Sequence, residues 1–273
     1  MLYKYCTTKG FDILLKSRLK TSKMNNFNDP FELDFGIDIE NAMKTIEEEF
    51  YSNLSKNDIL IVWLEKLKMY GIECDGDSIN EILNKISRLQ IALFKEAKRD
   101  IRNEWINKIG ITCLSENPDI IQMWAHYCSN HEGIVVGIDE MEIVNGKNDA
   151  LVKVDYSNEG MVFWPVRLNV HKEHGMRLRD LMHRKESSWC YEKEVRIYFD
   201  LNEIDEDGNY YYNIKPFAIK EIYLGLRSSE ETNIIAESIL RRDQYRHVKL
   251  YKMAKHESAI KLIAKEIKIN RSI

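Results

Sequence analysis

The sequence predicts an α+β fold: a mostly antiparallel central sheet with flanking helices and a helical insertion after the first strand-helix unit. From residue 108 onward, short apolar or alternating segments typical of strands dominate, whereas residues 39–108 carry apolar side chains at three- and four-residue spacing, as amphipathic helices do. With 273 residues, 44% of them hydrophobic, the chain can bury a sizeable core. We interpret residues 1–273 as a single α+β domain that contains the helical block 39–108 as an insertion or subdomain.

The first segments predict a short strand, Leu2–Cys6, and then an amphipathic helix. The apolar positions of this helix are Phe11, Leu14, Leu15 and Leu19. A loop rich in turn-forming residues follows at 21–36. We expect it at the surface, held in place by its three phenylalanines.

Three helices are expected in the helical block, in the segments 42–54, 57–70 and 78–105. The last begins at Asp77 or Ser78, and Glu81 stands three residues beyond Ser78, which is the spacing of a capping box. Nothing in the block suggests chemistry.

The remainder of the chain predicts seven strands, at 108–116, 133–139, 150–157, 194–201, 209–216, 219–226 and 247–253. Three helical stretches are expected among them. The first follows Asn117 as its cap, with Pro118 at the first helical position, where the missing N–H costs nothing. The others are expected at about 175–189 and at 229–242.

Charge and cysteine content narrow the function classes. The formal net charge is −4, so a nucleic-acid contact would need a local basic patch, and we expect a small-molecule or protein partner first. The five cysteines are scattered without CxxC spacing, which is typical of reduced, mostly buried thiols and not of a zinc site. The N-terminus lacks a signal-peptide pattern and no apolar run approaches the roughly 20 residues of a membrane helix. We therefore expect a cytoplasmic protein without membrane contact.

The segment "CYEKEVRIYFD", residues 190–200, carries an unusual row of polar side chains. Alternation on a strand would place Glu192, Glu194, Arg196 and Tyr198 on one face. Carboxylates two apart on a strand have Cβ atoms about 7 Å apart, close enough for each to shift the pKa of the other, and Arg196 could hold one of them ionised. Such a pair suits glycosyl transfer through an oxocarbenium-like centre. The alternative is a solvated outer face with cross-strand ion pairs.

The helix after residue 117 offers further candidates. Trp124 shares a stripe with Ile121 and Cys128, and Met123 pairs with Tyr127 at four-residue spacing. His126 either faces a cleft or is a hydrogen-bonded core histidine. Its five-residue spacing from His131 does not fit a metal motif, so we expect no metal site.

The turn "NDPFE", residues 28–32, ends in a carboxylate. Its structural interpretation is a loop fixed by local capping of backbone N–H groups. Its functional interpretation is that Glu32 or Asp29 faces the cleft. Both remain open at this point.

Several segments taken together resemble a bacterial family known as domain of unknown function 2971. They are "LYKY", "FNDPFE", "ITCLSE", "MWAHYCSNHEGIVVGID", "VDYS" and "KESSWCYEKEVRI", in that order. The resemblance covers most of the chain outside the helical block and implies no activity by itself.

A second resemblance implies an activity. A polar or aromatic residue on the first strand, a serine at the end of a middle strand and a Glu-x-Glu entering a later strand are similar to the ADP-ribosyltransferase superfamily. By position, the resemblance implies that Tyr3, Lys4 or Tyr5 contacts the nicotinamide side of NAD, that Ser115 shapes the pocket and that Glu194 is catalytic, with Glu192 before it. The first strand here has neither Arg nor His, and "CLSE" lacks a Ser-Thr-Ser run.

This resemblance implies NAD as a substrate, with Tyr5 or Trp124 against the nicotinamide ring and Arg196 or Arg167 at the pyrophosphate. His126 completes the candidate set for binding. The acceptor would be protein, nucleic acid or water, and such an enzyme would act as a bacterial toxin or defence effector; a homo-oligomer is left open. Two rivals remain: a metal-dependent nuclease using Asp29, Glu32, Glu192 and Glu194, and a non-catalytic binding module.

Overall fold

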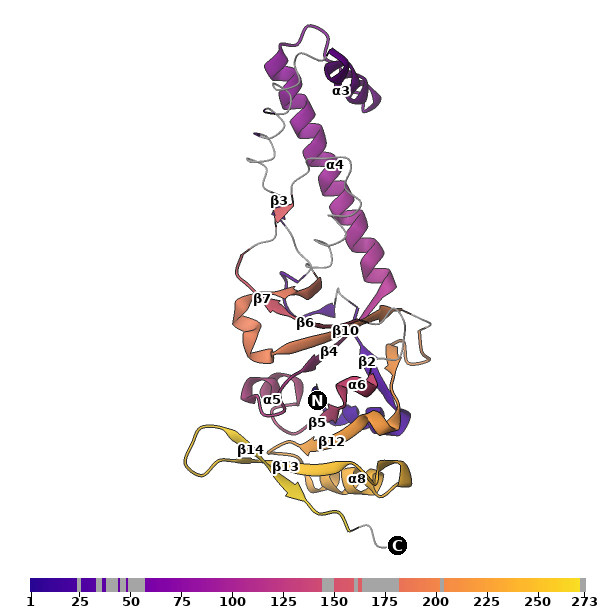
Figure 1. The fold of residues 1–273 in the computed structure, drawn as a ribbon, viewed down its shortest axis with the longest axis vertical. Coiled ribbons are helices and arrows are strands. Elements are labelled where there is room, and N and C mark those ends of the chain that lie inside the picture. The colour runs from indigo at the N-terminus through magenta and orange to yellow at the C-terminus, as the bar shows by residue number, and fades with distance from the viewer. Residues whose placement is uncertain are drawn as a thin grey trace. The chain divides into compact units, whose positions relative to one another are not determined.

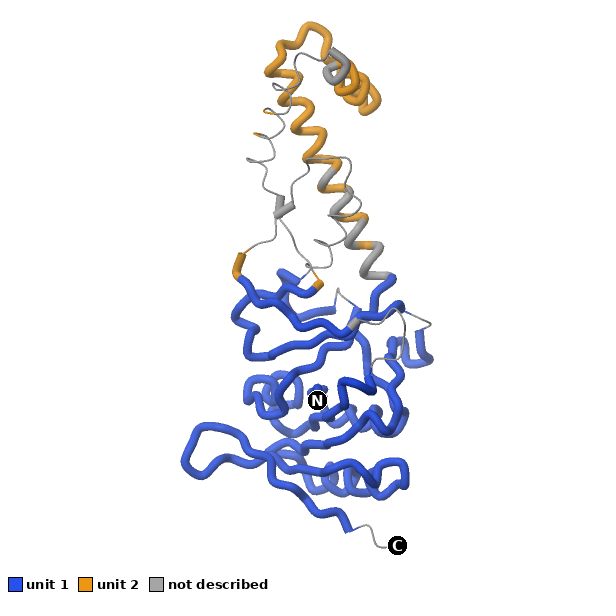
Figure 2. The backbone as a smooth tube through the Cα atoms, viewed as in Figure 1, with its two compact units in different colours: residues 1–32, 106–157, 183–273 blue, residues 33–105, 158–182 orange. Residues whose placement is uncertain are grey.

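The computed structural model describes residues 1–23, 26–32, 36–37, 44, 48, 57–143, 150–159, 162–163, 182–201 and 204–270. The chain divides into two compact units, drawn in different colours in Figure 2. Unit 1 comprises Met1–Glu32, Ile106–Ser157 and His183–Ile273, and unit 2 comprises Leu33–Trp105 and Asn158–Met182.

Unit 1 is built around an eight-stranded sheet with the order β14-β13-β12-β5-β1-β4-β10-β6 (Figure 1). All neighbours are antiparallel except β12 and β13. The predicted α+β class with a mostly antiparallel sheet is therefore confirmed. The strands are β1 (Leu2–Cys6), β4 (Ile109–Ser115), β5 (Ile134–Ile138), β6 (Ala150–Lys153), β10 (Glu194–Asp200), β12 (Ile219–Leu224), β13 (Lys249–Lys255) and β14 (Leu262–Ile267).

Helices pack against both faces of this sheet. On one face, α1 (Phe11–Lys16) and α8 (Glu230–Leu240) contribute Leu14 and Ile239 to the larger hydrophobic cluster. On the other face, α5 (Ile121–Tyr127) contributes Trp124 to a second cluster. Because its two faces are covered, the sheet buries side chains of both alternating sets.

Short elements complete unit 1. Two-stranded pairs form between β2 (Arg18–Thr21) and β11 (Tyr210–Asn213) and between β7 (Asp155–Tyr156) and β9 (Arg184–Lys185). The helix α6 spans Glu140–Ile143, and 3₁₀ turns occupy Thr8–Gly10 (η1), Ser187–Glu192 (η3), Pro216–Ala218 (η4) and Asp243–Tyr245 (η5).

Three predicted helices need correction. The first ends at Lys16, because Ser17 takes a left-handed conformation (φ 51°), and Leu19 therefore lies on β2. The second begins at Ile121, not after Asn117: Asn117 N–H is held by the Ser115 hydroxyl, and residues 117–120 remain outside the helix. Of the predicted helix 175–189, residues 175–181 lie outside the described residues, and 184–185 form β9 because they pair with β7.

The strand predictions were more accurate. All seven predicted segments contain strands, and the helix predicted at 229–242 is α8. In the central sheet β14 was not predicted, and the short strands β2 and β9 were also missed. The solvated outer face suggested for residues 190–200 is wrong, since β10 lies between β4 and β6 and its residues 194–199 are all buried.

The described part of unit 2 contains two helices, α3 (Asn57–Met69) and α4 (Ile79–Lys108, whose last residues belong to unit 1), and a short pair, β3 (Gly36–Ile37) with β8 (Val162–Phe163). The two helices share a small core around Leu67 and Ile86. One half of the predicted capping box at the start of α4 is confirmed: Ser78 N–H donates to Glu81 Oε2 over 2.7 Å, and the Ser78 hydroxyl donates to the same oxygen. The helix predicted at 42–54 lies almost entirely outside the described residues.

Among the described residues, no helix is both long and apolar enough to cross a membrane. All five cysteines are free, but only Cys128 is fully buried and Cys190 is exposed, so the expectation that most are buried is wrong.

Candidate functional site

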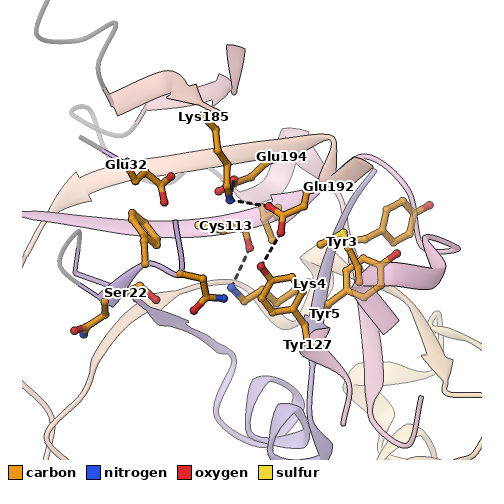
Figure 3. A pocket seen from close by; sticks show the side chains of 15 residues that line it. Tyr3, Lys4, Tyr5, Ser22, Glu32, Cys113, Tyr127, Lys185, Glu192 and Glu194 are labelled. Atoms are coloured by element: carbon orange, nitrogen blue, oxygen red, sulfur yellow. Dashed lines mark hydrogen bonds and ion pairs between the residues drawn. The ribbon is translucent and has the colours of Figure 1, made fainter. Parts of the chain in front are cut away.

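A cavity of about 340 Å³ opens on the α5 face of the sheet in unit 1 (Figure 3). Its volume is at the lower end of the range of small-molecule sites. Side chains from β1, β4, α5, β9 and the loop 26–32 meet there. The lining residues are Tyr3, Lys4, Tyr5, Ser22, Asn26, Phe27, Asn28, Glu32, Cys113, Leu114, Met123, Tyr127, Lys185, Glu192 and Glu194.

Three of the positions singled out in the sequence stand in one row across adjacent strands. Ser115, at the end of β4, pairs with Tyr3 on β1 and with Glu194 at the start of β10. Directly opposite residues of neighbouring strands project on the same face. Tyr3 and Glu194 line the cavity, while Ser115 is fully buried and donates to the backbone oxygen of Glu192 over 2.7 Å.

Glu192 reaches the cavity from outside the strand, which corrects the sequence interpretation. It ends the turn η3, and Lys193 then takes a left-handed conformation (φ 44°) before β10 begins at Glu194. The two carboxylates therefore do not follow strand alternation. They nonetheless meet at the same cavity, because the turn redirects the chain between them.

Lys185 joins the two carboxylates. Its Nζ lies 2.7 Å from Glu192 Oε2 and 3.0 Å from Glu194 Oε2. Burial alone would lower the pKa of Lys185, but the two carboxylates raise it above its ordinary value. The lysine is thus a permanent cation that lets two buried carboxylates stay close together.

Arg196 lies beneath the cavity and does not line it. Its side chain is fully buried; Nε donates to Glu194 Oε1 over 2.8 Å, and Nη2 is paired with Glu32. The interpretation that Arg196 meets a pyrophosphate is therefore corrected: its described partners include two protein carboxylates, and it positions Glu194 from below. Arg167 lies outside the described residues.

The carboxylate of Glu194 accepts hydrogen bonds from three donors, Lys185 Nζ and Arg196 Nε and Nη2, but it is buried away from water. Burial raises its pKa, and the neighbouring Lys185 opposes this increase. Its backbone N–H donates to the hydroxyl oxygen of Tyr156 over 2.8 Å. These contacts fix both the main chain and the side chain of this residue.

Lys4 supplies a cation at a gap in the sheet. The strands β1 and β4 pair at the single position Tyr3↔Ser115, whereas β1 and β5 pair along five residues. Lys4 Nζ donates to the Cys113 backbone oxygen over 2.9 Å (Figure 3). It makes no ion pair with any described residue, so its charge is available to an anionic group.

Aromatic side chains form much of the remaining wall. Tyr127 donates its hydroxyl proton to Glu192 Oε1 over 2.6 Å, and Tyr5 donates to the Asn117 backbone oxygen over 2.7 Å. Two predicted binding residues are elsewhere: Trp124 is fully buried against Tyr5, and His126 is exposed, outside the lining. A helix with Met123 and Tyr127 turned to the cavity presents Trp124 and His126 to other sides.

Sequence reasoning missed Lys185 and the role of Tyr127. Lys185 belongs to the two-residue strand β9, which is too short to carry a periodic pattern. The spacing of Met123 and Tyr127 did mark a distinct helix face, and both residues line the cavity. Glu32 of the turn 28–32 lies in the cavity wall, while Asp29 is buried outside it and caps Phe31 N–H over 2.8 Å.

The arrangement can stabilise positive charge next to aromatic surfaces. Glu192 and Glu194 are preorganised by Tyr127, Lys185 and Arg196, so they need no reorganisation when charge develops beside them. Among the described residues, no group of three or more His, Cys, Asp or Glu side chains is placed to hold a metal ion.

Comparison with known proteins bears on the family alone. No curated protein and no solved structure matches the chain. The segment 123–197 contains Tyr127, Lys185, Glu192, Glu194 and Arg196. This segment matches the family described as "Protein of unknown function (DUF2971)", which supports the resemblance to that family over these residues.

Proposed function

We propose that this protein is an ADP-ribosyltransferase-like enzyme that cleaves the nicotinamide–ribose bond of NAD and transfers the ADP-ribosyl group to an acceptor. The observation that carries the proposal is the cross-strand row Tyr3, Ser115 and Glu194. The resemblance to the ADP-ribosyltransferase superfamily implies Tyr3, Lys4 or Tyr5 for the first position, Ser115 for the second and Glu194 for the catalytic carboxylate. The row contains one residue for each position. Ser115 follows Tyr3 by 112 positions and precedes Glu194 by 79. The three residues meet in one row only because β4 lies between β1 and β10.

The site chemistry supports the same reaction. The C1′–N bond breaks with its electron pair leaving on the nicotinamide nitrogen, so positive charge develops on the ribose. A buried carboxylate stabilises this charge because the low-dielectric surroundings strengthen the attraction. Glu194 is 4% exposed and fixed by Arg196, and it is the carboxylate assigned to the ribose.

The acceptor completes the reaction by attacking the ribose carbon. An acceptor nucleophile or water forms the new bond to C1′ and loses a proton, while neutral nicotinamide leaves. Glu192, held by Tyr127 and Lys185, lies beside Glu194 and orients the nucleophile. The positive charge of Lys4 Nζ binds the anionic pyrophosphate of NAD.

The experiment measures nicotinamide release from NAD by wild type and by Glu194→Gln, with and without cell lysate as a source of acceptors. Glutamine keeps the size of the side chain but removes its charge. We expect release by wild type to fall about 100-fold or more in the variant, the usual loss when one preorganised electrostatic group is removed. Thermal unfolding of both proteins checks that the variant is folded.

The matched control is Glu116→Gln. Glu116 follows Ser115 directly but pairs with the exposed Lys153 and does not line the cavity, so its loss should leave release unchanged. Equal loss in both variants, or no release and no binding of NAD by wild type, would contradict the proposal. Cleavage of nucleic acid that depends on added Mg²⁺ would instead support the nuclease alternative.

A further inference from the structure

Glu32 has a carboxylate oxygen that no described residue satisfies. The residue is 4% exposed, and its Oε1 is paired with Arg196. Its Oε2 is buried and has no hydrogen-bond partner among the residues that the structure describes. Since Glu32 lines the cavity, this oxygen belongs to a side chain of the cavity wall.

A buried acceptor without a hydrogen-bond partner raises the free energy of the folded protein, because it has lost its water and gained no donor. A ligand that supplies the donor removes this cost. Native structures contain few such groups, and each one calls for a physical explanation. The loop that carries Glu32 is itself held in place: Glu32 N–H donates to the Asp29 backbone oxygen over 3.2 Å, and Asp29 caps Phe31. Oε2 is therefore presented by a constrained turn.

The two sides of the cavity differ in charge. Glu32 lies on the opposite side from Tyr3 and Tyr5 in Figure 3, with Lys4 between them. The side of Glu32 favours a cationic group that can donate a hydrogen bond, whereas Lys4 favours an anion. The Phe27 ring, which also lines the cavity, lies 5.2 Å from the Arg196 guanidinium carbon and is thus close to the same carboxylates.

In NAD, one group matches the side of Glu32. The nicotinamide ring is a cation, and its carboxamide carries an N–H donor. We infer that Glu32 Oε2 accepts this carboxamide N–H, with the ring against Phe27, and that Glu32 thereby selects NAD over dinucleotides that lack the donor. This inference rests on the proposed function. It moves the nicotinamide ring away from Tyr5 and makes Glu32 a residue that determines specificity.

Nicotinic acid adenine dinucleotide provides the sharpest probe, because it carries a carboxylate where NAD carries the carboxamide. It lacks the donor and would place a negative charge against Glu32. The 3-acetylpyridine analogue lacks the donor without adding charge. Sites built around a hydrogen bond discriminate strongly against ligands that cannot make it.

The experiment compares kcat/KM and dissociation constants for NAD and both analogues. For wild type we expect nicotinic acid adenine dinucleotide to be at least about 100-fold poorer than NAD in kcat/KM, with the 3-acetylpyridine analogue in between. In Glu32→Gln, the new amide can donate to the carboxylate, so the difference should shrink to about tenfold or less. Glu116→Gln serves as the control and should keep the preference of wild type.

The outcomes separate this inference from the proposed function. If wild type cleaves NAD but treats the three dinucleotides alike, only the role of Glu32 is overturned. If wild type neither binds nor cleaves NAD, both are overturned. Because the comparison of ligands on wild type needs no variant, the test stands even if Glu32→Gln fails to fold.

Discussion

At the scale of single residues, the site is a set of buried charges that compensate one another. Lys185 and Arg196 are shared among Glu32, Glu192 and Glu194, and each of these five residues is at most 8% exposed. Desolvation makes such a set expensive unless every charge is paired. A network of this kind specifies geometry more than it stabilises the fold, which suits a site that must hold carboxylates in place.

The raised pKa of Glu194 predicts a dependence of stability on pH. Because its pKa lies above the ordinary value of 4.5 in the folded state, the folded protein binds this proton more tightly than the unfolded chain. This contribution is fully present below the ordinary value and is lost as pH rises through the raised pKa. The free energy of unfolding of Glu194→Gln minus that of wild type should therefore increase from pH 4 to pH 8, measured by urea denaturation.

Asp207→Asn is the control of opposite sign. Its pKa is lowered, first by the hydrogen bond from Tyr211, so its contribution is present above the ordinary value and is lost as pH falls. The same difference for this variant should decrease as pH rises through the ordinary value of 3.8 and stay nearly constant from pH 5 to pH 8, so the control is measured from pH 3 upward. A difference for Glu194→Gln that stays constant or falls would show that burial does not raise the pKa of Glu194.

At the scale of elements, α8 depends on its cap and its buried face. Ser229 Oγ accepts the Thr232 N–H over 3.1 Å at the N-terminus, and Ala236, Ile239 and Leu240 are buried. Removing such a cap costs about 1 kcal/mol. We expect Ser229→Ala to lower the urea midpoint accordingly, and Ser229→Asp to retain most of the stability. Equal destabilisation by both changes would mean that the hydroxyl acts through something other than capping.

The link between η3 and β10 illustrates how an element boundary makes a site. Lys193 takes a left-handed conformation that ordinary residues adopt only where the surroundings favour it. Its N–H donates to the Cys190 oxygen, and its own oxygen accepts the Glu116 N–H. This joins the turn that ends at Glu192 to the end of β4, and so brings Glu192 and Glu194 to one cavity.

At the scale of the whole molecule, the free thiols report on folding. Cys190 is exposed, whereas Cys128 is fully buried and burial raises its pKa. In the folded protein at pH 8, a thiol reagent should modify Cys190 rapidly and Cys128 only on unfolding. Cys6, Cys74 and Cys113 are partly exposed and should react at intermediate rates. Cys190→Ser should therefore remove one thiol from the fastest phase, as followed by absorbance and mass spectrometry. An unchanged amplitude of the fastest phase in this variant would contradict the exposure of Cys190.

The site also depends on chain segments that are far apart. Tyr3, Glu32, Tyr127 and Lys185 come from four regions of the sequence, and all belong to unit 1. The order of strands brings them together: β1 lies between β5 and β4, and β10 lies beyond β4. Beyond the pair Tyr3↔Ser115, β1 and β4 are not paired, and there the Lys4 side chain donates to the Cys113 backbone oxygen.

The sequence by itself determined the α+β class, seven of the eight strands of the central sheet, the capping of the Ser78 N–H by Glu81 and the candidates Tyr3, Lys4, Tyr5, Glu192 and Glu194 of the cavity wall. Periodicity and capping are local properties, and local patterns suffice for them. Only the tertiary structure decided that Arg196 supports Glu194 from below, that Trp124 and His126 stand outside the cavity, and that Lys185 and Glu32 belong to its wall. These outcomes depend on which strands are neighbours and on which charges share a buried volume, and contacts between distant segments leave no periodic signal in the chain.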